Sequence, residues 1–222
     1  MHPQRWILIV ALALATGYVW LIGGFIGLAD VRSDAATRET ESLDVIQQKG
    51  FQVATFAGGC FWSTEAAFDA VPGVVTTTTG YTGGHVANPT YRQVVSGGTG
   101  HAEAVQVVFD ASAVSYDELL EHYWRSVDPF VRHRQFCDVG SQYRPEVFVH
   151  DEAQRQAAEA SKERVRRRFG RPALVEISAA QPFYRAEAHH QDYHQKYAAQ
   201  YTFYRVACGR DRRLSELWGD PD

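Results

Sequence analysis

The chain has 222 residues, of which 45% are hydrophobic, 13% aromatic and 22% charged. That length and apolar content are enough for one globular domain with an appendage, because domains commonly run to about 100–200 residues. The formal net charge of −4 provides no basic face for a phosphate backbone, so we expect no nucleic-acid partner.

The first part of the chain is a long apolar segment. Trp6 to Ala29 contains 24 residues and no charged side chain, which as a helix is long enough to cross a hydrocarbon core of about 30 Å. Arg5 precedes it and favours a cytoplasmic amino end. We therefore expect residues 1–29 to be a membrane anchor, with the rest of the chain on the periplasmic or extracellular side. The alternative is a signal peptide that is cleaved before secretion, although the apolar region of such peptides is usually only about 7–15 residues.

The remaining residues predict a polar linker followed by one domain. Residues 30–48 are polar, so the domain is expected over 49–222. Strands are predicted at 52–57, 74–79, 103–109, 145–150 and 173–178, with a loop at 80–89. Helices are predicted at 63–70, 115–125, 152–169 and 187–201, some of them with capping residues at the start. This order predicts an α+β fold, a two-layer sandwich with helices packed on a mixed or antiparallel sheet.

The chain has only three cysteines, Cys60, Cys137 and Cys208. This odd number is typical of redox chemistry rather than of a disulfide scaffold. Cys60 lies in Gly-Gly-Cys-Phe-Trp, where a predicted strand turns into a predicted helix. The N–H groups and the positive dipole end of that helix would favour a thiolate, which is the reactive form. The alternative is an inert cysteine buried at a strand–helix turn.

A second reactive group is predicted on the strand at 103–109. Glu103 shares one face of that strand with Val105, Val107 and Phe109. If this face is the core, desolvation raises the pKa of the carboxyl group and keeps it protonated near neutrality. A buried acid beside a thiolate forms a nucleophile and general-acid pair. A surface carboxylate at the strand end is the alternative.

Five ordered motifs resemble one enzyme family. They are Gly58-Gly59-Cys60-Phe61-Trp62, Gly80-Tyr81-x-Gly83-Gly84, Asn88-Pro89-Thr90-Tyr91, Gly97-x-Thr99-Gly100-His101-Ala102-Glu103 and Asp138-x-Gly140-x-Gln142-Tyr143-Arg144. Together they resemble the A-type peptide methionine sulfoxide reductases, from about residue 55 to residue 201. The resemblance implies reduction of the S epimer of methionine sulfoxide, free or in proteins, without a metal or an organic cofactor.

The resemblance also implies roles for individual residues. Cys60 attacks the sulfoxide sulfur, and Glu103 gives a proton to the developing oxygen anion. The other implied roles are phenol donors to that oxygen for Tyr91 and Tyr143, organisation of the polar network for Asp138, and an apolar seat for the substrate methyl group for Phe61 and Trp62. After methionine leaves, Cys60 is a sulfenic acid.

The cysteine that resolves this sulfenic acid is not evident from the family pattern. Many members have a recycling cysteine at the position of Val95, which this chain lacks. Cys208 lies in a Gly/Arg-rich segment that resembles the mobile tail of family members, so we expect it to be the resolving thiol. Cys137 precedes Asp138 and is the alternative. A thioredoxin-like reductant is expected to reduce the resulting disulfide.

Two other kinds of protein were considered. Cys60 followed by an aromatic residue, with His189 and His190 far downstream, is compatible with a papain-like protease, but that family's second local cysteine is absent. Glu187, His190 and His194 would share one face of a helix and could bind zinc. The resemblance instead places them in a structural helix, so we expect no metal.

The sequence therefore predicts a membrane-anchored, outward-facing and monomeric methionine sulfoxide reductase. Its expected substrates are oxidised envelope proteins and free methionine sulfoxide. A cytosolic reductant would not reach such a site, so the thioredoxin-like partner is expected outside the membrane.

Overall fold

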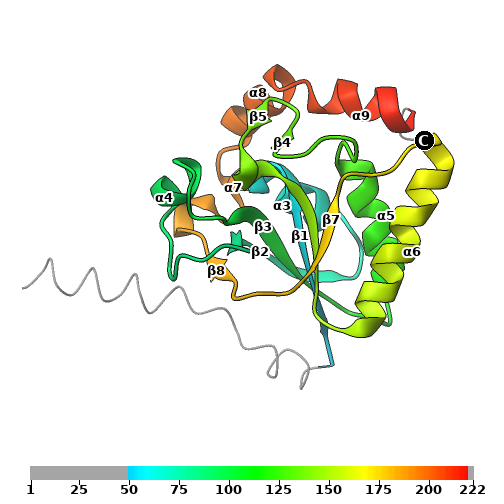
Figure 1. The fold of residues 1–222 in the computed structure, drawn as a ribbon. Coiled ribbons are helices and arrows are strands. Elements are labelled where there is room, and N and C mark those ends of the chain that lie inside the picture. The colour runs from blue at the N-terminus through cyan, green and yellow to red at the C-terminus, as the bar shows by residue number, and fades with distance from the viewer. Residues whose placement is uncertain (1–49, 220–222) are drawn as a thin grey trace, which may run out of the picture. The chain divides into compact units, whose positions relative to one another are not determined.

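The computed structural model describes residues 50–219 (Figure 1). The predicted membrane or signal segment at 1–29 and the linker at 30–48 lie outside these residues. Within 50–219, none of the helices has both the length and the apolar character needed to cross a bilayer.

One mixed six-stranded sheet forms the centre of the domain, in the order β7-β6-β1-β3-β2-β8. Its strands are β1 (Gln52–Gly58), β2 (Val74–Thr82), β3 (Ala102–Phe109), β6 (Pro145–Val149), β7 (Glu176–Ala179) and β8 (Tyr184–Arg185). All neighbours are antiparallel except β6 and β7, which are parallel. A separate hairpin pairs β4 (Arg134–Gln135) with β5 (Asp138–Val139). The predicted α+β class with a mixed sheet is confirmed.

Helices cover the sheet and one of its ends. They are α3 (Phe61–Asp69), α4 (Tyr91–Val95), α5 (Tyr116–Ser126), α6 (Glu152–Phe169), α7 (Tyr193–Lys196), α8 (Ala198–Ala207) and α9 (Arg210–Trp218), with short 3-10 turns η2 (Ser141–Tyr143) and η3 (Ala188–His190). In Figure 1, α5 and α6 lie side by side on one flank. Helices α8 and α9 cross the end at which the β4–β5 hairpin lies.

An aromatic stack in the core positions the helix that follows β1. Phe56 of β1 stacks on Phe68 of α3, with ring centroids 4.7 Å apart, and on Tyr123 of α5, with centroids 5.1 Å apart. All three rings are fully buried. Such aromatic pairs contribute about 0.5–1.5 kcal/mol each beyond the burial of their area. The stack therefore holds α3 against β1 through the last turn of the helix, and Cys60 precedes the same helix at the carboxyl end of β1.

Strand β2 is longer than predicted because it passes through a glycine. We expected a loop from Gly80, but β2 continues to Thr82. A Cβ at Gly80 would collide with the Tyr184 carbonyl and the Phe183 ring. Glycine within this strand marks a close approach of two chain segments rather than its end.

The segment after β8 also differs from the prediction. The continuous helix expected over 187–201 is wrong, since the chain forms η3, α7 and part of α8 instead. The Gln191 side chain bonds both the N–H and the carbonyl of Thr79 on β2. Asp192 then takes a left-handed conformation with φ 54°. Bonds from this segment to β2 replace the local bonds that a continuous helix would need.

Candidate active site

Cys60 caps the amino end of α3 after a tight turn. Gly59 has φ +88°, and a Cβ there would come within 2.6 Å of the Gln135 Cβ. Only glycine adopts this conformation readily. The turn leaves the Cys60 side chain 7% exposed, so the sulfur sits in a nearly closed environment at the first turn of the helix.

The electrostatic state of Cys60 differs from the expected thiolate. Burial raises the pKa of the thiol far above its ordinary value, and the carboxylates of Glu103 and Asp138 raise it further. The Trp62 N–H and the Tyr204 hydroxyl bond the sulfur and lower the pKa, as expected at a helix start, but by less. Sequence reasoning identified the helix end correctly and missed the larger effect of burial. The resting sulfur is therefore a thiol.

Glu103 lies against the amino end of the same helix. Its side chain is 1% exposed, and its Oε2 accepts the Phe61 N–H at 3.0 Å. Burial raises the pKa of Glu103 to about 8, although the Phe61 N–H acts in the opposite direction. The structure thus agrees with the predicted buried, protonated acid on β3.

Two tyrosines face the same centre from separate elements. The pKa values of Tyr91 in α4 and Tyr143 in η2 are raised by burial first and by Glu103 second. Cys60 raises both as well. The Tyr91 N–H is held by Glu187 Oε1 at 3.0 Å. The other carboxylate oxygen of Glu187 accepts the Tyr81 hydroxyl at 2.9 Å. Glu187, which we had considered only as a metal ligand, therefore positions Tyr91.

The aromatic side chains after Cys60 have different surroundings. Phe61 is 1% exposed and packs under Tyr91, with ring centroids 6.3 Å apart. Trp62 is half-buried and stacks on Tyr193 of α7 at 3.7 Å. Its Nε1–H donates to His190 Nδ1 at 3.1 Å, and burial lowers the pKa of His190 to about 4. A neutral His190 with Nδ1 as acceptor fixes the indole in this orientation.

Asp138 is joined to α8 by a short hydrogen bond. The Tyr204 hydroxyl donates to Asp138 Oδ2 at 2.5 Å. Burial raises the pKa of Asp138, while Tyr204, Arg210 and the Cys60 N–H lower it. Tyr204 was not among the predicted residues, because 66 residues separate it from Asp138 and no local pattern links them.

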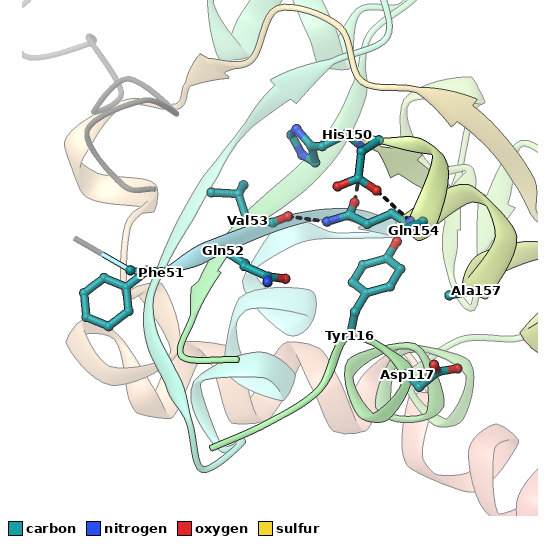
Figure 2. A pocket seen from close by; sticks show the side chains of 11 residues that line it. Phe51, Gln52, Val53, Tyr116, Asp117, His150, Gln154 and Ala157 are labelled. Carbon is teal, nitrogen blue, oxygen red and sulfur yellow. Dashed lines mark hydrogen bonds between the residues drawn. The ribbon is translucent and has the colours of Figure 1, made fainter. Parts of the chain in front are cut away.

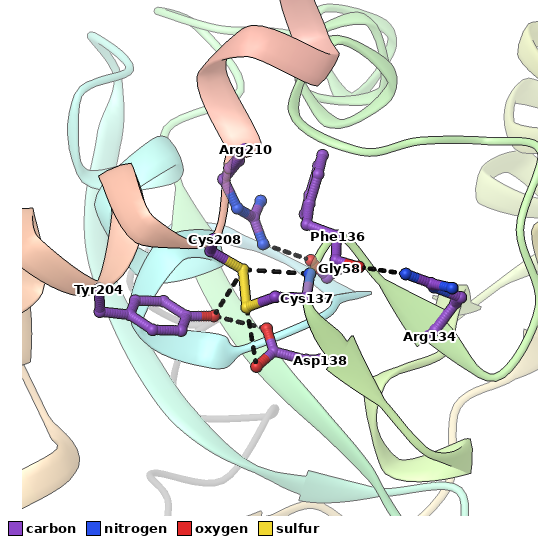
Figure 3. The surroundings of a disulfide bond; sticks show 8 residues. All are labelled: Gly58, Arg134, Phe136, Cys137, Asp138, Tyr204, Cys208 and Arg210. Carbon is purple, nitrogen blue, oxygen red and sulfur yellow. Dashed lines mark hydrogen bonds between the residues drawn. A yellow bond between two sulfur atoms is a disulfide. The ribbon is translucent and has the colours of Figure 1, made fainter.

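The two remaining cysteines are bonded to each other. Cys137 and Cys208 form a disulfide (Figure 3), and Cys60 is the free cysteine. Cys137 is exposed and Cys208 is half-buried. The setting of Cys208 is not the mobile tail we expected, because it lies between α8 and α9. Its Sγ is 4.0 Å from the Tyr204 hydroxyl, which also bonds the Cys60 sulfur.

The proposed zinc ligands do not converge. Glu187 binds Tyr81 and the Tyr91 N–H, and His190 binds Trp62. His194 lies instead 3.4 Å from Asp69. Within 50–219, the one group of three potential ligands is Cys137, Asp138 and Cys208, two of which are in the disulfide. The zinc-binding helix is therefore not formed.

A pocket of about 580 Å³ lies at the other end of β1 from Cys60. Figure 2 shows Phe51 and Val53 on one side of it and Tyr116 and Gln154 on the other. Gln154 Nε2 donates to the Val53 carbonyl at 2.7 Å, which ties α6 to β1. None of the three cysteines lines this pocket, so it is distinct from the region around Cys60.

Comparisons with known proteins agree with this geometry. The family model for peptide methionine sulfoxide reductase matches residues 52–222. The peptide methionine sulfoxide reductase MsrA of Bacillus licheniformis is 47% identical over 170 residues, which is 76% of this chain and 94% of the relative. The MsrA of Listeria innocua is 46% identical over 173 residues, covering 77% and 98%.

Two solved structures share the fold. The reduced form of Mxr1 from Saccharomyces cerevisiae aligns with a TM-score of 0.62 and 30% identity, over 66% of this chain and 85% of that chain. Methionine sulfoxide reductase A of Corynebacterium diphtheriae aligns with a TM-score of 0.60 and 32% identity, over 66% and 75%.

The buried acid makes stability depend on pH. The pKa of Glu103 is about 8 in the folded protein against 4.5 for an ordinary glutamate. The folded state binds this proton more tightly, so the contribution of Glu103 to stability is fully present below about pH 4.5 and is lost as the pH rises through about 8.

Glu103→Gln stays neutral throughout. We expect the free energy of unfolding of the wild type, measured in urea, to fall across this range relative to that of Glu103→Gln. Glu65, whose pKa burial raises to about 7, is present in both proteins and cancels. Parallel profiles would show that Glu103 is not a buried acid.

Proposed function

The chain belongs to the peptide methionine sulfoxide reductase family and carries out thiol-dependent reduction of methionine sulfoxide, and we propose that the site around Cys60 reduces the S epimer. One observation supports the assignment of this reaction to particular residues. The protonated Glu103 carboxyl lies 3.0 Å from the amide that directly follows Cys60. A nucleophile and a proton donor therefore face one small volume, as attack on a sulfoxide requires.

In the proposed first step, the Cys60 sulfur bonds to the sulfoxide sulfur while Glu103 gives its proton to the oxygen. The resulting hydroxyl group then transfers to the Cys60 sulfur, as the bond between the two sulfurs and the substrate S–O bond break. The Cys60 thiol proton replaces the one that Glu103 gave, so no external acid is consumed. The products are methionine and the Cys60 sulfenic acid, which together contain all the atoms of the sulfoxide and the thiol. Protonation of Glu103 also removes its charge, which otherwise disfavours ionisation of Cys60.

The neighbouring tyrosines and aromatic residues would select and hold the sulfoxide. Tyr91 and Tyr143 are phenol donors with raised pKa values, so they remain protonated and donate to the oxygen as charge develops on it. Phe61 in the core cluster and Trp62 packed against that cluster would provide an apolar seat for the S-methyl group. Asp138 orders Tyr204, which bonds the Cys60 sulfur.

The disulfide supports a two-stage resolution of the sulfenic acid. Because the Tyr204 hydroxyl is near both Cys60 and Cys208, we assign the first attack to Cys208, which forms a Cys60–Cys208 disulfide and releases water. The Cys137 thiolate then attacks Cys208, frees Cys60 as a thiol and leaves the Cys137–Cys208 disulfide. Each step exchanges one S–O or S–S bond for another, and the net oxidation ends on the exposed pair.

The final disulfide is placed where a protein reductant can reach it. Cys60 is buried whereas Cys137 is exposed, and a thioredoxin-like protein must bring its own sulfur into contact with the bond it reduces. We assign this dithiol partner to the Cys137–Cys208 pair. Its two electrons return both cysteines to thiols.

We further propose that residues 1–29 anchor the domain to the membrane, facing the periplasm or the extracellular side, where it repairs oxidised envelope proteins. The support is the uncharged run from Trp6 to Ala29 after Arg5. Secretion after signal cleavage is the alternative outcome. In either arrangement the reductant would also lie outside the cytoplasm.

Epimer-resolved reduction of methionine sulfoxide tests the chemistry. Cys60→Ser is expected to lose all activity because the substitution removes the nucleophile that faces Glu103. Glu103→Gln is expected to lose about 10²- to 10⁴-fold in rate, the usual contribution of a positioned acid. Glu118→Gln, an exposed carboxylate in the α5 cap, serves as the matched control and should match the wild type. Reduction of only the R epimer would contradict the proposal.

Intact-mass analysis after one turnover tests the order of resolution. Cys208→Ser should accumulate the Cys60 sulfenic acid, because the nearer resolving thiol is gone. Cys137→Ser should instead trap the Cys60–Cys208 disulfide, because the second exchange is impossible. An unchanged yield of a disulfide to Cys60 in Cys208→Ser would assign the first attack to Cys137.

A reporter fused after Asp222 tests the membrane arrangement. We expect activity from a reporter that folds only outside the cytoplasm, in a membrane fraction, and none when residues 1–48 are deleted. A soluble extracellular fusion would indicate signal cleavage. Activity confined to a cytoplasmic reporter would overturn the outward orientation.

A further inference from the structure

Arg210 is a buried cation at the start of the last helix. It is 2% exposed, and it is the only arginine or lysine in the buried set of residues 50–219. Burial lowers the pKa of its guanidinium, which reflects the cost of holding a charge away from water. Charged side chains are almost never fully buried unless a group of opposite charge is near. The position of Arg210 therefore calls for an anionic partner.

The guanidinium packs on the turn that precedes Cys60. One nitrogen donates to the Gly58 carbonyl at 3.0 Å and another to the Ser126 carbonyl at 2.9 Å. The group also lies over the Phe136 ring, 4.2 Å from its centroid. A Cβ on Gly59 would be 3.2 Å from Nη2. Figure 3 shows Arg210 extending from α9 to Gly58 above the disulfide.

These direct partners are neutral. Carbonyl oxygens and an aromatic face satisfy the donors but do not balance the charge, and no ion pair of Arg210 is formed within the described range. Several groups that are negative when ionised interact with it. Arg210 lowers the pKa of Asp138, and Tyr204 first and Cys60 second raise the pKa of Arg210.

The two carboxyl groups facing Cys60 oppose its ionisation, whereas the Trp62 N–H and the Tyr204 hydroxyl favour it through hydrogen bonds. The groups that face it are Glu103 from β3, Asp138 from β5, Tyr91 from α4, Tyr143 from η2, Tyr204 from α8 and Arg210 from α9. Two are carboxyls and three are phenols. Arg210 is thus the only member of this set that attracts a negative sulfur through a full charge.

We propose that Arg210 is the charge partner of the Cys60 thiolate, a positioning residue from α9 that also holds the Gly58–Gly59 turn. Its relevance to turnover rests on the proposed reductase chemistry. When Cys60 loses its proton to the reacting centre, the guanidinium is already in place to stabilise the anion, and no reorganisation is needed. The last helix therefore contributes to the active site itself, and not only through Cys208.

The pH dependence of Cys60 alkylation tests this role. With the Cys137–Cys208 disulfide intact, Cys60 is the one free cysteine, so iodoacetamide reports its ionisation alone. Arg210→Gln removes the charge and keeps a donor. We expect its rate profile to shift upward by about one pH unit or more, the usual effect of losing an opposite charge nearby. Arg210→Lys retains the charge and should shift by less than half as much. The series is repeated with Glu103→Gln, because the Glu103 carboxylate raises the pKa of Cys60.

Arg213→Gln is the matched control for docking of the helix. It breaks the ion pair of α9 with Asp128 at 2.8 Å and leaves Arg210 in place, so its profile should equal that of the wild type. Thermal unfolding checks that each variant is folded. If Arg210→Gln does not fold, the alkylation profile of Arg210→Lys tests the proposal. The proposal is overturned if folded Arg210→Gln keeps the wild-type profile, if Arg210→Lys shifts by a full unit, or if Arg213→Gln shifts as far as Arg210→Gln. Because alkylation needs no sulfoxide, this outcome is independent of the reductase assay.

Discussion

The buried hydrogen bond from the Phe61 amide to Glu103 connects the two halves of the reactive centre. It joins the first turn of α3, which carries the nucleophile, to β3, which carries the acid, at 3.0 Å. The bond can form only because the Phe56 stack seats α3 against the sheet and because the glycine turn brings Cys60 down to the end of β1. A shift of α3 by even one residue would separate the sulfur from its proton donor. The core packing therefore determines the geometry of the chemistry.

Burial then sets the charges at this centre. With both Cys60 and Glu103 almost completely removed from water, the neutral forms of the two groups are favoured. A resting thiol is protected from adventitious oxidation, since the thiolate is the reactive form. The same arrangement holds one proton on Cys60 and one on Glu103, and the proposed reaction uses both protons. Ionisation of the sulfur is thus coupled to the arrival of a sulfoxide oxygen that can accept a proton.

Local patterns in the sequence were sufficient to predict part of the site. The strand–glycine–cysteine–helix order predicted the position of Cys60, and alternation along 103–109 predicted that Glu103 is buried. Those signals span fewer than ten residues. The contacts of Tyr204 and Arg210 depend on segments 66 and 152 residues apart, for which one sequence contains no local signal. The same reason explains the unpredicted Cys137–Cys208 pair, separated by 71 residues, and the break in the helix after Glu187, whose side chain bonds a distant strand and helix.

Cys208 and Arg210, at the junction of α8 and α9, place opposite requirements on the same segment. Cys208 has to approach Cys60 to resolve it, whereas Arg210, two residues later, is fixed to the Gly58 carbonyl. Under the proposed chemistry these demands do not coincide in time. Negative charge develops on the sulfur during attack, when Arg210 should be held. The sulfenic acid that follows is neutral, which removes the attraction between Arg210 and the sulfur at the stage at which Cys208 must move. The left-handed Gly209, with φ 68°, lies between these two residues and is the one position in this stretch where the backbone can turn without strain on a side chain. After oxidation of Cys60, only the bonds to the Gly58 and Ser126 carbonyls hold Arg210, without an added charge attraction to the sulfur.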